Sequence, residues 1–498
     1  MEIVATFVPR PEADLAAELA RPPAGATMVE LRADLLPAEA DLSGLVAAAR
    51  LPVMLTLRSR AEGGRGFDEP ERRRAFFSRA AELPVALFDL EAARDVDLVG
   101  RVIPAERVVL STHFPSAVPP DLEERTAKAL SVGTRLVKIV PHARSVADVV
   151  SVLRLAETLE RTPPSRRRVV VFATGEAGRL TRVLGPLLGA PLGYAAWSSE
   201  RVAVEGQFEP SALLALVGHL TGRPRWVFLV VGRDVGASLS PFMHAAAYRA
   251  LGLPSVFVPL EVTAAEDLDS LICPLGESCL DQLGLPLGGL AVTMPWKGEA
   301  VRRCSVVAPR AQRAGAVNTV LPRPGKVLGD CTDIDGISRV LLERGVELAG
   351  SRVLVLGTGG AARAAVVAMQ LAGATPLVAA RDAAKAARMG MELGAESVDP
   401  ADAEQVGVLI NATPAGLAGQ NSELLESVRL GQQAVAVDLP YGAAPTVLEE
   451  LAGSRGWIYV GGREVLLYQG VSQFAAMSGV APPVRAMASV LGLRDEAG

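Results

Sequence analysis

Residues 351–382, SRVLVLGTGGAARAAVVAMQLAGATPLVAARD, form the stretch that decides the fold of the second half of the chain. Arg352–Leu356 is a short run of β-branched and leucine residues, which predicts a buried parallel strand. A glycine-rich turn, Gly357–Ala361, follows it, and an alanine-rich helix is expected over Ala361–Leu371. Thr375–Ala380 predicts a second strand. A strand, a glycine turn, a helix and a strand in this order indicate a Rossmann-type dinucleotide-binding unit.

The turn and the start of the predicted helix suit a pyrophosphate. The first N–H groups of a helix have no intrahelical partner, and the positive end of its dipole attracts an anion. About 20 residues past the turn, where an acid would hold the ribose 2′-hydroxyl of NAD, stands Arg381, which suits the 2′-phosphate of NADP. Asp382 follows it and weakens this charge argument. The alternative is a glycine turn that packs a helix closely and binds nothing.

Length, composition and charge are typical of a globular protein with two or three domains. The chain has 498 residues, of which 50% are apolar and 21% charged. A net charge of −5 offers no basic surface for nucleic acid, and no apolar run is long enough to span a bilayer. The four cysteines lack CxxC spacing, which predicts reduced thiols in a cytoplasmic protein without a metal site. The sequence enters a strand at once, so we expect no signal or transit peptide.

The first 222 residues alternate short apolar strands with helical segments. Eight strands in this length predict a (β/α)₈ barrel, in which chemistry lies at the carboxyl ends of the strands. The expected strands are Ile3–Val8, Met28–Arg32, Val53–Leu57, Ala86–Leu90, Arg107–Ser111, Leu136–Val140, Arg168–Ala173 and Leu192–Trp197. Polar residues stand at or just after the ends of several strands; they are Glu30, Arg32, Asp34, Arg58, Glu62, Asp89, Glu91 and His113.

Lys138 interrupts the apolar run of the sixth predicted strand. Burial inside a barrel would lower its pKa and free the amine to attack a carbonyl. The alternative is a lysine at the strand edge that extends into water. A Schiff-base enzyme also needs an acid and base, for which His113 is placed, oriented by Glu62 or Glu91. Two arginines could clamp a carboxylate, namely Arg58 and Arg182.

Motifs of this half resemble those of type I 3-dehydroquinate dehydratases. They are VELRAD, LRSRAEGG, LSTHF, LVKIV and the run over residues 175–184, and the resemblance covers nearly all of the first 220 residues. It implies that Lys138 forms an imine with 3-dehydroquinate, and that His113 is the acid and base with Glu62 as its partner. The substrate-binding residues that it implies are Glu30, Arg32, Arg58, Arg182 and Gln207. Arg182 is preferred to Arg179 because the Ser-Arg pair of the family falls on Thr181-Arg182.

A Thr-Gly-Arg-Pro break at residues 221–224 places a domain boundary near residue 222. Beyond it, four loops of small and polar residues follow apolar strands, which is how a site for a polyhydroxylated ligand is built. The loops contain Ser238 and Ser240, Thr293 to Lys297, Asn318, and Asp333. Taken singly, the serines would be helix caps and Asn318 a turn residue.

Together with the glycine turn, these loops resemble shikimate dehydrogenases over residues 226–498. The resemblance implies Lys297 and Asp333 as the catalytic pair and NADP as the cofactor. The substrate contacts that it implies are Ser238, Ser240, Thr293, Asn318, Tyr441 and Gln469. The NADP contacts that it implies are Gly357, Gly359, Gly360, Ala361, Arg381, Asn411 and Thr413.

The sequence therefore predicts a bifunctional enzyme of the shikimate pathway, which leads to chorismate and the aromatic amino acids. The barrel half would dehydrate 3-dehydroquinate, and the second half would reduce the product to shikimate with NADPH. The predicted parts are a barrel at 1–222, a substrate-binding lobe at 223–332, a Rossmann lobe at 333–463, and C-terminal helices at 464–498 that return to the substrate-binding lobe. The expected partners are small-molecule substrates, and the oligomeric state is left open.

Two alternatives remain, because the motifs are not complete. Phe114 and Ala203 depart from the dehydratase pattern, so the barrel could be a non-catalytic binding or assembly module. A dehydrogenase that prefers quinate is the other alternative, although both serines favour shikimate. The departures in the second half are Ala237, Ala291 and Cys331.

Overall fold

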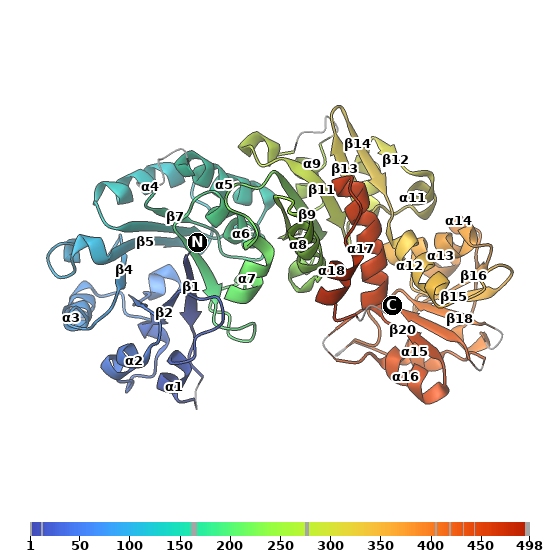
Figure 1. The fold of residues 1–498 in the computed structure, drawn as a ribbon, viewed down its shortest axis with the longest axis horizontal. Helices are drawn as coiled ribbons and strands as arrows, with labels where there is room; N and C mark the ends of the chain where they lie inside the picture. Colours follow the sequence, from blue (N-terminus) through green and yellow to red (C-terminus); the bar gives the residue numbers. More distant parts are fainter. Residues whose placement is uncertain are drawn as a thin grey trace.

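The computed structural model describes residues 2–10, 13–160, 167–273, 278–403, 406–417, 420–431, 433–442 and 444–493. We refer to residues 2–222 as the barrel half and to residues 223–493 as the second half. The two halves pack side by side, with the chain passing once from one to the other (Figure 1). Among the described residues, no helix combines the length and the apolar character needed to cross a membrane.

Eight parallel strands form the wall of the barrel half. They are β1 (Glu2–Phe7), β2 (Met28–Arg32), β3 (Val53–Thr56), β4 (Leu87–Glu91), β5 (Val108–Phe114), β6 (Leu136–Pro141), β7 (Val169–Val171) and β8 (Leu192–Ala196). Their order in the sheet is β7-β6-β5-β4-β3-β2-β1-β8, which confirms the predicted barrel. No ladder joins β7 to β8 in the described part of the chain, so the barrel is not fully closed there.

Alternation along each strand separates the barrel interior from the surface beneath the helices. Val4 and Met54 belong to an interior cluster, whereas their neighbours Ile3 and Leu55 belong to the core that the helices cover. The helices are α1 (Leu15–Leu19), α2 (Leu42–Ala48), α3 (Pro70–Ala80), α4 (Leu122–Ser131), α5 (Val146–Glu160), α6 (Arg179–Leu187) and α7 (Pro210–Val217). The apolar layer ends toward the carboxyl ends of the strands, where the polar side chains gather.

The second half contains two sheets. The first has the order β10-β9-β11-β13-β14-β12, with β13 antiparallel to both of its neighbours. Its strands are β9 (Trp226–Gly232), β10 (Ser255–Glu261), β11 (Leu287–Val292), β12 (Val306–Val307), β13 (Thr319–Arg323) and β14 (Lys326–Asp330). Its helices are α8 (Ser240–Leu251), α9 (Asp267–Leu271), α10 (Lys297–Arg303) and α11 (Pro309–Ala314).

The other sheet is parallel throughout, with the order β17-β16-β15-β18-β19-β20. Its strands are β15 (Arg352–Leu356), β16 (Thr375–Ala379), β17 (Glu396–Ser397), β18 (Val408–Asn411), β19 (Val435–Asp438) and β20 (Ile458–Val460). Its helices are α12 (Asp333–Glu343), α13 (Gly360–Leu371), α14 (Ala383–Leu393), α15 (Glu423–Ser427) and α16 (Val447–Arg455). The strand order reverses between β15 and β18, as in Rossmann sheets that bind ligands at this point.

The last two helices lie against the first sheet of the second half. They are α17 (Gly462–Ser478) and α18 (Val484–Val490). α17 packs along α12 and also contacts β11 and β13, and α18 packs against α8 (Figure 1). α17 therefore lies beside the cleft between the two sheets, where its polar side chains can face a ligand.

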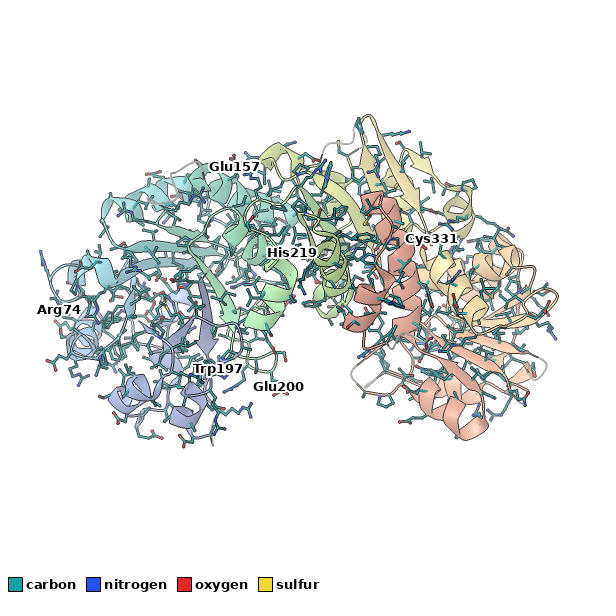
Figure 2. The ribbon with its side chains drawn as sticks, viewed as in Figure 1. Arg74, Glu157, Trp197, Glu200, His219 and Cys331 are labelled. Carbon is teal, nitrogen blue, oxygen red and sulfur yellow. The ribbon has the colours of Figure 1, made fainter. Side chains whose placement is uncertain are left out.

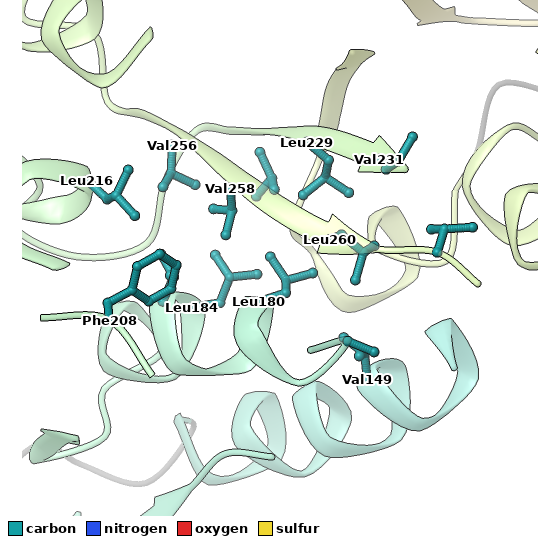
Figure 3. Close-up of a cluster of buried hydrophobic side chains, with 14 of the residues drawn as sticks. Val149, Leu180, Leu184, Phe208, Leu216, Leu229, Val231, Val256, Val258 and Leu260 are labelled. Carbon is teal, nitrogen blue, oxygen red and sulfur yellow. The ribbon is translucent and has the colours of Figure 1, made fainter. Parts of the chain in front are cut away.

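The barrel half and the second half share an apolar interface. His219, just after α7, lies at this junction (Figure 2), and its Nε2 is 3.0 Å from the carbonyl oxygen of Ser255. Beneath it, Leu180 and Leu184 of α6 pack against strand β10, including Val258 (Figure 3). These three side chains are fully buried, so the two halves form one continuous core.

Candidate functional site

A cavity of about 260 Å³ opens at the carboxyl ends of the barrel strands. All eight site residues expected in this half line it; they are Glu30, Arg32, Arg58, Glu62, His113, Lys138, Arg182 and Gln207. They meet because the carboxyl ends of parallel strands gather at one end of a barrel, although up to 177 residues separate them in the sequence.

Lys138 points into the barrel rather than to its edge. Only 3% of its side chain is exposed, and Nζ lies 2.5 Å from Asp89 Oδ2 and 3.6 Å from Glu30 Oε1. The Tyr194 ring lies 4.6 Å from the same nitrogen. Lys138 is therefore buried and paired with two carboxylates, and does not extend from a strand edge into water.

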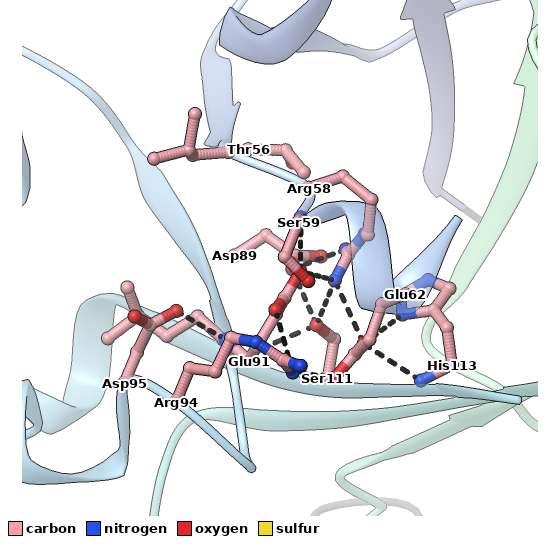
Figure 4. A network of polar contacts seen from close by, with 12 residues as sticks. Thr56, Arg58, Ser59, Glu62, Asp89, Glu91, Arg94, Asp95, Ser111 and His113 are labelled. Carbon is pink, nitrogen blue, oxygen red and sulfur yellow. Dashed lines mark hydrogen bonds and ion pairs between the residues drawn. The ribbon is translucent and has the colours of Figure 1, made fainter. Parts of the chain in front are cut away.

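His113 is held by Glu62, one of two acidic partners left open by the sequence. His113 Nδ1 is 2.9 Å from Glu62 Oε2, and the same oxygen accepts the backbone N–H of His113 at 3.0 Å (Figure 4). Burial, together with Arg58 and Lys138, lowers the pKa of His113 well below its usual value. A neutral ring that donates through Nδ1 has a free lone pair on Nε2, so His113 can accept a proton from a substrate.

Arg58 is occupied by carboxylates of the protein. It donates to Asp89 at 2.7 Å, to Glu91 at 3.1 Å and to Glu62 at 3.3 Å, and it also donates to Ser111 at 3.0 Å (Figure 4). Burial raises the pKa of Glu62 to about 7, even though Arg58 opposes this shift. A substrate carboxylate at Arg58 would therefore share the guanidinium group with three carboxylates of the protein, and the expected role of Arg58 in substrate binding stays a prediction.

Arg182 is a buried arginine of this cavity with hydrogen-bond donors that no described residue pairs. It is buried over the Phe172 ring at 4.4 Å, and its Nε and Nη1 have no hydrogen-bond partner in the described part of the chain. Burial and the nearby charge of Arg179 lower the pKa of Arg182 to about 9. By contrast, Arg32 is paired with Asp34 at 2.7 Å. A buried cation with free donors facing a cavity suits an anionic ligand.

Sequence reasoning gave no role to three residues of this cavity or its wall. Asp89 forms the ion pair with Lys138, and the alternation of Leu87, Asp89 and Glu91 along β4 could have indicated that both acids point inward. Tyr194 and His142 also line the cavity. Nothing in the local sequence distinguishes these two from ordinary strand-end residues.

A larger cleft, of about 710 Å³, lies between the two sheets of the second half. The eight catalytic and substrate-binding residues expected in this half all line it; they are Ser238, Ser240, Thr293, Lys297, Asn318, Asp333, Tyr441 and Gln469. Ala361, at the start of α13, lines the same cleft. The glycine turn and the polar loops thus face one space.

Lys297 and Asp333 form a half-buried ion pair at the starts of α10 and α12. Nζ of Lys297 is 2.6 Å from Asp333 Oδ2, and Asp333 Oδ1 accepts a hydrogen bond from Asn318 at 2.8 Å. The same amide group of Asn318 donates to Gln469 at 3.2 Å. Burial opposes the charge on Lys297, but Asp333 outweighs it and raises the pKa of the lysine. Lys297 is therefore a positively charged proton donor in a fixed position.

The glycine turn has the shape that a dinucleotide needs. Gly357 has φ of +116°, and a Cβ there would lie 3.0 Å from the carbonyl oxygen of Ala412. A Cβ on Gly360 would lie 3.0 Å from Cδ of Lys297, so the turn touches this lysine directly. Gly359, the residue before α13, supplies no side-chain cap, which leaves the first N–H groups of the helix for an anion. These residues fit a dinucleotide cofactor.

Of the residues expected to contact the cofactor, Arg381 is exposed and Asn411 is buried. Arg381 is exposed at the end of β16 and can reach a ligand. Asn411 is 0% exposed, and its side-chain amide donates to Asp438 at 2.8 Å and to the Ala415 carbonyl at 3.1 Å. Its Oδ1 accepts from Thr413. The Asn411 side chain therefore braces the loop after β18 and is not free to bind a cofactor.

Comparison with known protein families agrees with the division of the chain. The model of type I 3-dehydroquinase matches residues 4–222, and the model of the shikimate dehydrogenase substrate binding domain matches residues 230–320. The barrel half therefore matches the type I 3-dehydroquinases, and residues 230–320 of the second half match the substrate binding domain of shikimate dehydrogenases.

Similar proteins include longer ones. The chain is 30% identical over 466 residues to the pentafunctional AROM polypeptide of Candida glabrata, which is 88% of this chain but 28% of that protein. It thus spans under a third of the length of this relative. It is 28% identical over 492 residues to the chloroplastic bifunctional 3-dehydroquinate dehydratase/shikimate dehydrogenase of Arabidopsis thaliana, covering 92% of this chain and 79% of that protein.

Among solved structures, shikimate 5-dehydrogenase of Thermus thermophilus, in complex with NADP(H) and shikimate, is 32% identical to the matched part of this chain. The match covers 54% of this chain and 98% of that chain, with a TM-score of 0.47.

Proposed function

We propose that this dehydroquinase–dehydrogenase chain catalyses two consecutive reactions. The barrel half would dehydrate 3-dehydroquinate to 3-dehydroshikimate, and the second half would reduce 3-dehydroshikimate to shikimate with NADPH. The observation that carries the proposal is that each half gathers one lysine, a carboxylate paired with it and the remaining polar groups in a single cavity. We propose a dehydratase barrel at 1–222, a substrate-binding lobe at 223–332, a Rossmann lobe at 333–463 and C-terminal helices at 464–498.

In the barrel cavity, Arg182 would bind the substrate carboxylate, because it is the buried cation with free donors. The amine of Lys138 would attack the ring ketone and expel water, which forms an imine. His113 would then remove a proton from the carbon next to the imine and deliver it to the hydroxyl that leaves as a second water. Hydrolysis of the imine takes up one water, so the net reaction releases one. Glu62 would keep His113 in the tautomer that this requires.

In the second cleft, Ser238 and Ser240 would hold the carboxylate, and Lys297 would protonate the ketone oxygen as it is reduced. Asp333 and Asn318 fix the position of the ammonium group through the 2.6 Å ion pair and the 2.8 Å hydrogen bond. NADPH, when bound at the glycine turn, would supply the hydride. The contact between Gly360 and Lys297 brings the cofactor turn and the proton donor together.

The four cysteines are free thiols, which supports the further proposal of a cytoplasmic location.

Borohydride trapping tests the first activity. With 3-dehydroquinate present, borohydride should reduce the imine and leave a covalent adduct on Lys138, detected by peptide mass spectrometry. The Lys138→Ala variant should form no adduct and should still oxidise shikimate. Lys297→Ala is the matched control, because it should lose shikimate oxidation and keep the adduct. A folded wild-type protein that forms no adduct would favour the non-catalytic barrel.

A further inference from the structure

The start of α6 in the barrel half contacts a turn of the second half. The loop before α6 joins it to β7, and Thr174 and Gly175 of this loop line the barrel cavity. Arg179 is the first residue of α6, and Arg182 of the same helix faces the cavity. The start of α6 thus lies between the two sites.

Arg179 contacts Gly236 across the interface. Its Nη1 donates to the carbonyl oxygen of Gly236 at 3.3 Å. A Cβ on Gly236 would lie only 2.7 Å from Nη1 and Nη2, so the guanidinium group rests directly on the glycine backbone. On the barrel side, the same group forms an ion pair with Glu176 and lies 5.3 Å from the Phe208 ring. Arg179 is therefore held from the barrel half while it supports the other half.

The supported turn carries the two serines of the second cleft. Gly236 belongs to the short 3₁₀ helix Val235–Ala237, and Ser238 follows it directly. The Ser238 N–H donates to the Val235 carbonyl at 3.1 Å, and the Ser240 N–H donates to Ser238 Oγ at 3.3 Å. A displacement of Gly236 would thus move both serine side chains.

We propose that Arg179 is a positioning residue for the dehydrogenase site. It holds the Gly236 turn in the place where Ser238 and Ser240 bind the substrate carboxylate. The affinity of the second half for its substrate then depends on a side chain of the barrel half. This inference rests on the proposed shikimate dehydrogenase function. It also explains why the guanidinium group of Arg179, a residue of the barrel half, contacts Gly236 of the second half.

Three variants of the full-length chain test the proposal. Arg179→Met keeps the aliphatic stem over Phe208 and removes the donors, whereas Arg179→Lys keeps the charge and one donor group. Arg249→Met is the matched control, because Arg249 makes another hydrogen bond between the halves, to the Ala215 carbonyl at 2.7 Å, and lines neither cavity. Each variant is assayed for shikimate oxidation with NADP, which gives kcat and the KM values for shikimate and for NADP. Amide hydrogen exchange is measured for residues 235–240.

We expect Arg179→Met to raise the KM for shikimate about tenfold while kcat and the KM for NADP stay within about twofold, as for loss of one charged hydrogen bond. Arg179→Lys should recover part of the loss, and Arg249→Met should match the wild type. A KM for shikimate in Arg179→Met equal to that of Arg249→Met would overturn the proposal. If the wild type oxidises no shikimate, the proposed function fails, and hydrogen exchange decides the inference. Faster exchange in Arg179→Met alone supports it, and equal exchange in both variants overturns it.

Discussion

Methionine substitutions at Arg58 and Arg182, two of the buried arginines that line the barrel cavity, should change the stability of the protein in opposite directions. Arg182 has unpaired buried donors, and the lowering of its pKa from 12.5 to about 9 corresponds to at most about 5 kcal/mol of unfavourable burial at pH 7. Loss of its contact with Phe172 offsets part of this, so we expect Arg182→Met to stabilise the ligand-free chain by about 1–3 kcal/mol. Arg58→Met would remove one of the cations that balance the buried carboxylates Asp89 and Glu91 and should cost about 3–5 kcal/mol.

Scanning calorimetry at pH 7 measures the change in stability of both variants. Dehydratase kinetics measure the effect of Arg182→Met on substrate binding. Arg182→Met should raise the KM for 3-dehydroquinate about a hundredfold, because the substrate carboxylate loses its bidentate partner. Added 3-dehydroshikimate should raise the Tm of the wild type and not that of Arg182→Met. The reasoning is refuted if Arg182→Met lowers the Tm as much as Arg58→Met does, or if its KM is that of the wild type.

Three further substitutions test the second half. Lys297→Met should lower kcat for shikimate oxidation by orders of magnitude while NADP still binds, as followed by fluorescence titration; unchanged kcat would remove Lys297 from the mechanism. Arg381→Ala should raise the KM for NADP about tenfold and leave that for NAD unchanged, and equal changes for both would exclude a contact with the 2′-phosphate. Burial raises the pKa of Asp438 to about 6, so the folded state holds a proton that the unfolded state releases, and stability should fall as pH rises from about 4 to 6. Asp438→Asn should reduce that fall in urea titrations by the share of one carboxyl group, since Glu62 contributes a fall of the same sign, and an unchanged slope would contradict this assignment.

The parts of the molecule that could be predicted from sequence follow from backbone periodicity. The expected strand Met28–Arg32 and the strand Arg352–Leu356 coincide with β2 and β15. The meeting of Lys138 and His113 in one cavity also follows from position alone, because strand ends converge in a barrel. Alternation and strand order fix these features without knowledge of side-chain packing.

Features that depend on side-chain packing across distant segments could not be predicted. Arg58 and Arg182 look equivalent in sequence. In the structure, Arg58 forms ion pairs with carboxylates, whereas Nε and Nη1 of Arg182 have no hydrogen-bond partner among the described residues. Asn411 matches a cofactor motif, but its side-chain amide donates hydrogen bonds to Asp438 and to the Ala415 carbonyl. The partners of such groups are set by tertiary contacts, which no local pattern encodes.

The most direct test of the two-reaction account supplies the purified chain with 3-dehydroquinate alone and then with NADPH. The account predicts ultraviolet absorbance of the conjugated enone first, followed by consumption of NADPH without any added 3-dehydroshikimate. No enone from 3-dehydroquinate, together with NADPH consumption when 3-dehydroshikimate is supplied, would contradict it and would show that only the second half is active.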